Sequence, residues 1–75
     1  MRNPHHVPKI KVEVDLLMTD GGLLRGFVYI RANERVMDLL NGTETFVAFQ
    51  ESETHEITLL NKTSIAGVKP LDQRG

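Results

Sequence analysis

A strict alternation of apolar and polar residues from position 9 to position 18 constrains the fold more than any other feature of the sequence. The apolar positions recur at every second residue: Ile10, Val12, Val14, Leu16 and Met18. A period of two places these side chains on one face of a β-strand, whereas a helix would scatter them around its circumference. The segment that follows, Thr19-Asp20-Gly21-Gly22, tolerates the positive φ angles of a tight hairpin. The sequence therefore predicts a β-hairpin here.

The returning strand, residues 23–31, is predicted to have one apolar and one mixed face. The glycine at position 26, within the apolar face, predicts a bend or a bulge. The mixed face alternates arginines with aromatic rings: Arg25, Phe27, Tyr29 and Arg31. Such a face could stack nucleic-acid bases and contact phosphates. We favour the simpler interpretation, in which Phe27 and Tyr29 pack beneath the helix that follows and the arginines lie at the rim.

The period of two breaks over residues 33–41, where the spacing of the apolar residues predicts a helix of about two turns. Asn33 is the expected N-cap, and Gly42 is the expected stop. Three more short strands are expected at residues 46–49, 57–60 and 64–68. The predicted fold is mainly β: a small, strongly bent five-stranded sheet or barrel with one short helix between the second and third strands.

The chain is short, with 75 residues and no cysteine. We expect one domain over residues 9–70, a flexible arm at 1–8 and a tail at 71–75. A domain of this size buries too little apolar surface for a wide margin of stability, and small folds usually need an additional stabilising device. Without cysteine, disulfides and thiolate zinc sites are excluded. Self-association is the device that remains.

The net charge is −1 and the pI is about 6.3, so no overall basic field attracts the chain to nucleic acid or acidic membranes. The longest apolar run, residues 27–30, is far shorter than the roughly 20 residues that span a bilayer. The first residues do not form the apolar core of a signal peptide. From these features we expect a cytoplasmic protein with no membrane partner.

No motif for catalysis or for a cofactor stands out. His5 and His6 are adjacent, but a fixed metal site needs roughly three or four converging ligands, so we interpret them as part of the flexible arm. Asp20-Gly21-Gly22 lacks the Lys-Ser/Thr and the helix start of a phosphate-binding loop. We therefore expect neither an enzyme, nor a metal site, nor a cofactor.

Two parts of the chain resemble the Hfq/Sm-like family. Residues 60–70, Leu-Asn-Lys-Thr-Ser-Ile-Ala-Gly-Val-Lys-Pro, resemble its second signature, with a connector lysine, an isoleucine three residues later and a valine-proline ending. The first signature is matched by the alternating strand, the glycine hairpin and the glycine-bearing second strand within residues 10–30. Residues 35–41 resemble a segment of small uncharacterised bacterial Sm-like proteins.

The resemblance implies an Sm-like barrel of the SH3-like type, assembled into a cyclic ring of about five to seven subunits. It also implies single-stranded RNA binding at the pore through the connector between strands four and five. Lys62 is the one residue that matches a family RNA contact, and Asn61 and Thr63 beside it are expected to offer hydrogen-bonding groups. Arg25 and Arg31, from the mixed face of the second strand, are additional candidate cationic contacts. The chain departs from the family at several points. The family's N-terminal helix has no counterpart in the arm, the third strand lacks the Asp/Asn-bearing turn that binds a base, and bacterial Hfq has a histidine where this chain has Thr63.

Two functional hypotheses therefore stay open. The first is a ring that binds RNA at its pore, and the second is a homo-oligomeric assembly or protein-interaction module with no role in nucleic-acid binding. Both use a head-to-tail interface between strands four and five of neighbouring copies. The interface residues expected from the strand pattern are Ile57, Leu59, Leu60, Ile65 and Val68.

Overall fold

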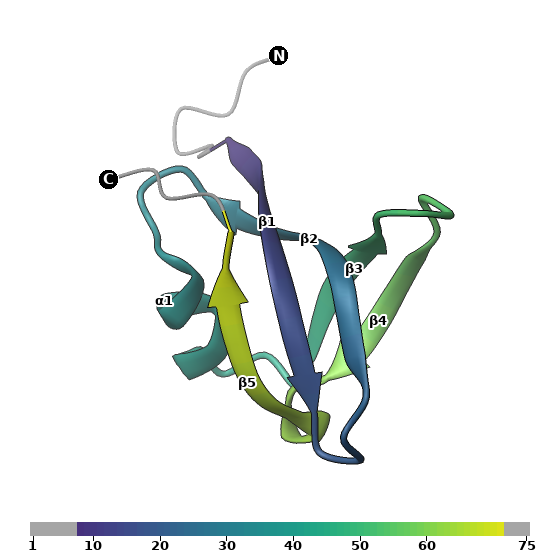
Figure 1. Ribbon diagram of the computed structural model, residues 1–75. Coiled ribbons are helices and arrows are strands. Elements are labelled where there is room, and N and C mark those ends of the chain that lie inside the picture. Colours follow the sequence, from purple (N-terminus) through teal and green to yellow (C-terminus); the bar gives the residue numbers. More distant parts are fainter. Residues whose placement is uncertain (1–7, 72–75) are drawn as a thin grey trace.

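The computed structural model describes residues 8–71, which form one five-stranded antiparallel sheet and a short α-helix (Figure 1). The strands are β1 (Lys9–Met18), β2 (Leu23–Arg31), β3 (Phe46–Glu51), β4 (Ile57–Asn61) and β5 (Ile65–Pro70). The helix α1 (Val36–Asn41) connects β2 to β3, and a single 3-10 turn, η1 (Lys62–Ser64), connects β4 to β5. The prediction of a mainly β fold with one helix between the second and third strands is confirmed. His5 and His6 lie outside the described residues.

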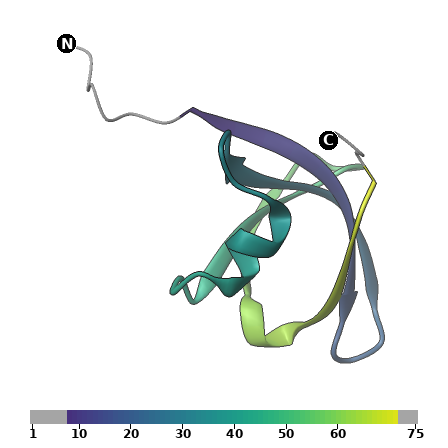
Figure 2. The same cartoon turned by 90° about the vertical axis from the view of Figure 1, so that its left-hand side faces the viewer.

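The strand order is β4-β3-β2-β1-β5, so the two strands that η1 joins occupy opposite ends of the sheet. Figure 2 shows that the sheet is strongly curved and that α1 lies at its open side. No ladder connects β4 to β5 in the described part of the chain, and the sheet is therefore open. Within residues 8–71 no helix has the length and apolar character needed to cross a membrane.

The predicted hairpin between β1 and β2 is present. The Gly21 amide donates to the Met18 carbonyl oxygen at 2.9 Å, and the Met18 amide donates to the Gly22 carbonyl oxygen at 2.8 Å. Gly21 has a φ of 91°, a conformation in which a β-carbon is strained, and the Asp20 carboxylate accepts a hydrogen bond from the Gly22 amide. The turn residues thus set the register in which β1 and β2 pair.

The glycine within β2 allows close approach of the next strand. The β1–β2 register runs without interruption through Val14 and Gly26, so this position is not a bulge in that pair. Instead, a β-carbon at Gly26 would collide with the Gln50 carbonyl oxygen and lie 2.7 Å from Cζ of Phe49. Gly26 is therefore the point where β3 packs tightly onto β2. The irregular step in the sheet lies between β1 and β5, at Leu17 and Met18.

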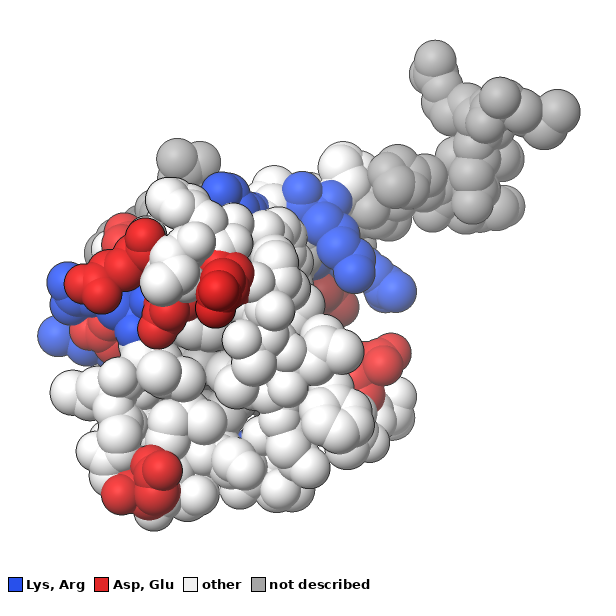
Figure 3. All heavy atoms as spheres, turned by 90° about the vertical axis from the view of Figure 1, so that its right-hand side faces the viewer, with Lys and Arg blue, Asp and Glu red and all other residues white. Residues whose placement is uncertain are grey.

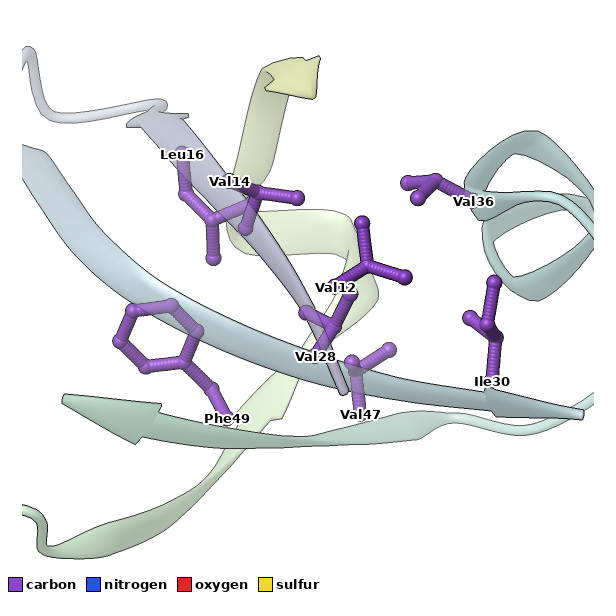
Figure 4. Packing of buried hydrophobic residues seen from close by; sticks show 8 residues of the cluster. All are labelled: Val12, Val14, Leu16, Val28, Ile30, Val36, Val47 and Phe49. Carbon is purple, nitrogen blue, oxygen red and sulfur yellow. The ribbon is translucent and has the colours of Figure 1, made fainter. Parts of the chain in front are cut away.

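The hydrophobic core lies on the concave face of the sheet, where eight buried side chains meet (Figure 4). They come from β1, β2, α1 and β3: Val12, Val14, Leu16, Val28, Ile30, Val36, Val47 and Phe49. Most even-numbered residues of β1 and β2 face this core, as their alternation predicted, whereas Ile10 at the start of β1 is 41% exposed. Val36 attaches α1 to the same side of the sheet as Ile30.

The placement of α1 corrects one prediction. Because Val36 packs with the even-numbered core residues of β2, the odd-numbered Phe27 and Tyr29 lie on the opposite, convex face, where they are half-buried. The expectation that these two rings pack beneath the helix is wrong. The physical reason is that the helix is drawn to the more apolar of the two faces of β2.

The helix also begins two residues later than expected. Its N-cap is Arg35 rather than Asn33, and the Arg35 amide donates to the Asp38 carboxylate at 2.9 Å. The segment before it forms a turn, in which the Glu34 amide donates to the Arg31 carbonyl oxygen. A carboxylate at the third helical position therefore fixes the helix start, and Asn33 stays outside the helix.

The last strand is longer than predicted, because it continues through Lys69 and Pro70. The Leu71 amide donates to the Glu13 carbonyl oxygen on β1. Because hydrogen-bonded and non-hydrogen-bonded residues alternate along an antiparallel ladder, the backbone N–H and C=O groups of residues 67, 69 and 71 point toward β1. Pro70 falls between them, at a position whose missing N–H would point away from the sheet. A proline is tolerated at such an edge position without loss of a ladder bond.

Candidate functional site

The connector between β4 and β5 was predicted to bind RNA, and the structure shows that its polar groups bond to one another. The Asn61 side-chain oxygen accepts hydrogen bonds from the Thr63 amide at 3.0 Å and from the Thr63 hydroxyl at 2.8 Å. These bonds cap the start of η1. Asn61 and Thr63 therefore form the turn that lets the chain pass from one end of the sheet to the other.

Lys62, the central residue of the connector, is directed at the end of α1. Its ammonium group donates hydrogen bonds to the carbonyl oxygens of Leu40, at 3.3 Å, and of Gly42. The last carbonyl groups of a helix have no partner within the helix, and a cation is favourable beside them. Lys62 thus fastens α1 to the connector, a contact that the sequence did not predict because the two segments are about 20 residues apart.

The two arginines proposed as RNA contacts lie at opposite ends of β2. Arg25 makes a two-pronged ion pair with Asp15 on β1, at 2.7 Å and 2.9 Å, and its guanidinium holds the pKa of that carboxyl below the usual value. Arg31 is six residues further along the strand, which is about 20 Å in an extended chain. The structure therefore does not bring Arg25 and Arg31 into one site.

The residues expected at a subunit interface divide into two groups. Ile57 and Leu59 on β4 are 56% and 66% exposed. The other three, Leu60, Ile65 and Val68, are partly buried against the core of their own chain. Only the β4 pair therefore presents a largely uncovered apolar surface, because β5 directs its larger side chains inward.

An apolar face covers the outside of β3 and β4. Phe46 is 54% exposed, and the strand register places it on the same side as Ile57 and Leu59. We call these three residues the β4 face. Figure 3 shows this side of the molecule, where charged side chains gather mainly around the rim. The sequence pattern places Phe46 in a strand but does not reveal its exposure, since the burial of Phe46 depends on what covers β3.

The free edges of the sheet also offer unpaired backbone groups. The backbone amide of Glu51 donates to the Glu56 carbonyl oxygen, and the backbone amide of Lys62 donates to the Thr45 carbonyl oxygen. These bonds fix the alternation of the β3–β4 ladder, so the N–H and C=O groups of Ile57 and Leu59 point away from β3. At the opposite edge, the corresponding groups of Val68 point away from β1.

A groove of about 460 Å³ opens where β2 and β3 separate. The ladder between these strands covers only residues 26–28 and 49–51, so residues 29–31 and 46–48 diverge. Lys9 and Arg31 line one part of the groove, and Glu34, Asp38 and Glu44 approach it from α1 and its flanking loops. The apolar part of the wall is formed by Leu39, Phe46, Val47, Ala48 and Leu59. Tyr29 lines the groove as well, so the groove opens on the convex face where Tyr29 lies.

Within residues 8–71, no three histidine, aspartate or glutamate side chains gather closely enough to hold a metal ion. Comparison of the chain with protein-family models, with curated proteins and with solved structures gave no match. The free edges, the β4 face and the groove are therefore the surfaces of this structure that bear on its function.

Proposed function

We propose that this chain is a self-assembling module whose copies join head to tail, with β4 of one copy beside β5 of the next. The observation that carries the proposal is the pair of free edges at opposite ends of one open sheet. Each edge offers backbone donors and acceptors that a second copy would satisfy. Because the contact uses two different surfaces of the same chain, it is heterologous and closes into a ring when the rotation permits.

The apolar β4 face supports the same proposal. Ile57 and Leu59 remain largely exposed in the single chain, together with Phe46. Burial of such side chains against a neighbouring copy is favourable by about 1.5–3 kcal/mol for each large apolar residue. A domain with a core of only eight buried side chains gains much from that additional burial.

The strand arrangement supports an Sm-like barrel as the finer description of this fold. The five short strands, the single turn η1 between β4 and β5 and the curvature of the open sheet support that description. In that reading, the ring contains about five to seven copies.

RNA binding through the connector has less support than assembly. The Lys62 ammonium bonds to carbonyl oxygens of α1, and Asn61 and Thr63 bond to each other. An RNA phosphate would have to replace these internal bonds. We therefore propose assembly as the primary function, and the RNA hypothesis is decided by the same purified sample.

The experiment is light scattering on freshly purified protein at micromolar concentration, with the absorbance ratio at 260 and 280 nm recorded on the same fractions. The expected result is a single species of about five to seven copies, without copurifying nucleic acid. A stable monomer of 8.5 kDa would overturn the assembly proposal. A ring that carries nucleic acid would restore the RNA hypothesis and leave the assembly intact.

A further inference from the structure

The convex face of β1, β2 and β5 carries most of the positive charge of the described chain. The strand registers place alternate residues of these three strands on that side of the sheet. Within residues 8–71, five of the seven lysines and arginines lie on this face, against two of the nine carboxylates. The face is therefore positive, although the whole chain has a net charge of −1. The cations are Lys9, Lys11, Arg25, Arg31 and Lys69, and the carboxylates are Glu13 and Asp15.

Three of these cations gather at one end of the face. The β1–β2 register places Lys9 directly opposite Arg31, and Lys11 follows two residues after Lys9. The β-carbons of directly opposed residues are about 5 Å apart, and alternate residues of one strand are about 7 Å apart. All three side chains are exposed, and we call them the cationic end. Like charges at such positions repel each other, so a bound anion would relieve the repulsion.

The neighbouring carboxylates form no ion pair with the cationic end. Glu13 lies on the same face without such a pair, and the only ion pair within residues 8–71 joins Asp15 to Arg25 further along the strands. Glu34 follows the end of β2, and its carboxylate accepts a hydrogen bond from the Arg31 backbone amide at 3.2 Å. The charge of the cationic end is therefore left for a partner from outside the chain.

One of the three cations is held in place by its neighbours. The Lys11 ammonium lies 4.8 Å from the centre of the Phe27 ring and 3.5 Å from the Gln50 side-chain oxygen. The same oxygen accepts a hydrogen bond from the Tyr29 hydroxyl at 3.3 Å, and the Gln50 side-chain nitrogen donates to the His55 carbonyl oxygen at 3.1 Å. A cation that is ordered before binding loses less conformational entropy when it holds a ligand.

The surroundings of the cationic end favour an acidic polypeptide over a nucleic acid or a lipid surface. Base stacking needs a free aromatic face. Phe27 and Tyr29 are half-buried, and the Lys11 ammonium lies over the Phe27 ring. Binding to a lipid surface would use exposed apolar side chains beside the cations. The exposed leucines of this face, Leu17 and Leu23, lie at its opposite end.

We propose that the cationic end binds an extended acidic segment of another protein, with carboxylates at every second residue. An extended chain directs alternate side chains to one side at intervals of about 7 Å, which is also the interval between Lys9 and Lys11. The Arg31 guanidinium offers a fork of donors that matches a carboxylate. The cationic end lies on β1 and β2, whereas the proposed assembly uses the edges of β4 and β5, so each proposal fails or succeeds separately.

The test is fluorescence anisotropy of the full chain at low salt, with a labelled peptide in which single glutamates alternate with single threonines. The control peptide has the same length, composition and charge, but pairs of glutamates alternate with pairs of threonines. In an extended conformation, each side of the control peptide carries a carboxylate only at every second of its positions. The alternating peptide should bind about threefold or more tightly than the control. Equal binding of both peptides, or binding of neither, would overturn the proposal.

Matched variants locate the site. The double variant K9Q/R31Q should weaken binding of the alternating peptide about tenfold or more, whereas Lys69→Gln, on β5 at the other end of the same face, should change it less than about twofold. Circular dichroism confirms that both variants are folded. Equal losses in the two variants would show attraction by the net charge alone and contradict the proposed site.

Other occupants give different results with the same proteins. Labelled oligouridylate and vesicles that contain anionic phospholipid are measured beside the peptide. If either binds more tightly than the alternating peptide and is lost in K9Q/R31Q, the cationic end serves a nucleic acid or a lipid, and the proposal is wrong. Light scattering should give K9Q/R31Q the same oligomeric state as the native chain. A change in that state would show that a second copy covers the cationic end, which would also contradict the proposal.

Discussion

The ammonium nitrogen of Lys62 lies 3.3 Å from the carbonyl oxygen of Leu40 and also bonds to that of Gly42, so a residue of the connector completes the end of α1. The helix has only six residues and no basic residue in its own last turn. Isolated helices of this length are unstable, so α1 depends on contacts from outside itself. Lys62 is one of them, and Val36 in the core is another.

Replacement of Lys62 by methionine should therefore destabilise the fold by about 1 kcal/mol, because the carbonyl groups at the end of α1 lose a charged donor. In a domain of this size, the melting temperature should fall by about 4–8 °C. The control is Lys69→Met, which removes an exposed lysine from β5. Calorimetry at one protein concentration measures both, and equal shifts would contradict the capping role of Lys62.

Replacement of Gly26 by alanine should destabilise the fold by about 2–3 kcal/mol. The new β-carbon collides with the backbone carbonyl of Gln50, and neither strand can withdraw without breaking the short β2–β3 ladder. Gly67→Ala is the control, since its β-carbon would meet only Cβ of Leu17 at 3.8 Å, an ordinary contact. Urea unfolding of both variants decides the matter: if Gly26→Ala is as stable as Gly67→Ala, β2 and β3 do not pack this closely.

The Asp15–Arg25 pair predicts how stability depends on pH. The hydrogen bond from Arg25 lowers the pKa of Asp15 in the folded state, so the folded chain binds fewer protons than the unfolded chain near pH 4. The stabilisation is therefore complete above the unfolded pKa of about 3.9 and is lost as the pH falls through the lower folded value. The gain is small, because the Arg25 side chain is 60% exposed.

Urea midpoints between pH 7 and pH 2.5 measure this effect. Asp15→Asn should remove this part of the decline at low pH, and Arg25→Gln should reduce it in the same way, since each variant deletes one partner. The difference between the native chain and either variant should also shrink in about 1 M salt. Parallel pH profiles for all three proteins would show that the pair makes no contribution.

The proposed interface predicts that charged substitutions at two exposed apolar residues affect assembly differently. Leu59→Asp places a charge on the β4 face and should dissociate the assembly, because the aspartate would lose its hydration against a neighbouring copy. Met37→Asp is the matched control, as Met37 on α1 is exposed to a similar degree, at 69%. Sedimentation velocity distinguishes the two variants. If Met37→Asp dissociates the assembly and Leu59→Asp does not, the interface lies on α1.

The sequence by itself determined the elements of this protein and the faces they bury. Alternation over residues 9–18, the Asp-Gly-Gly turn and the apolar positions of β2 predicted the hairpin and most of its core residues. These predictions succeed because the side-chain period and the turn conformation are properties of neighbouring residues in the chain. The sequence marked the glycine in β2 as unusual, but the group that requires a glycine there, the carbonyl of Gln50, lies 24 residues away.

Only the tertiary structure decided what covers each face and where each ladder ends. It placed α1 on the core side of β2, left Phe27 and Tyr29 on the convex face and turned Lys62 toward the carbonyl groups of α1. It also separated β2 from β3 after Val28 and so opened the groove beside Lys9 and Arg31. These features depend on contacts between segments that are distant in sequence, and a local pattern carries no information about which distant segment will make the contact.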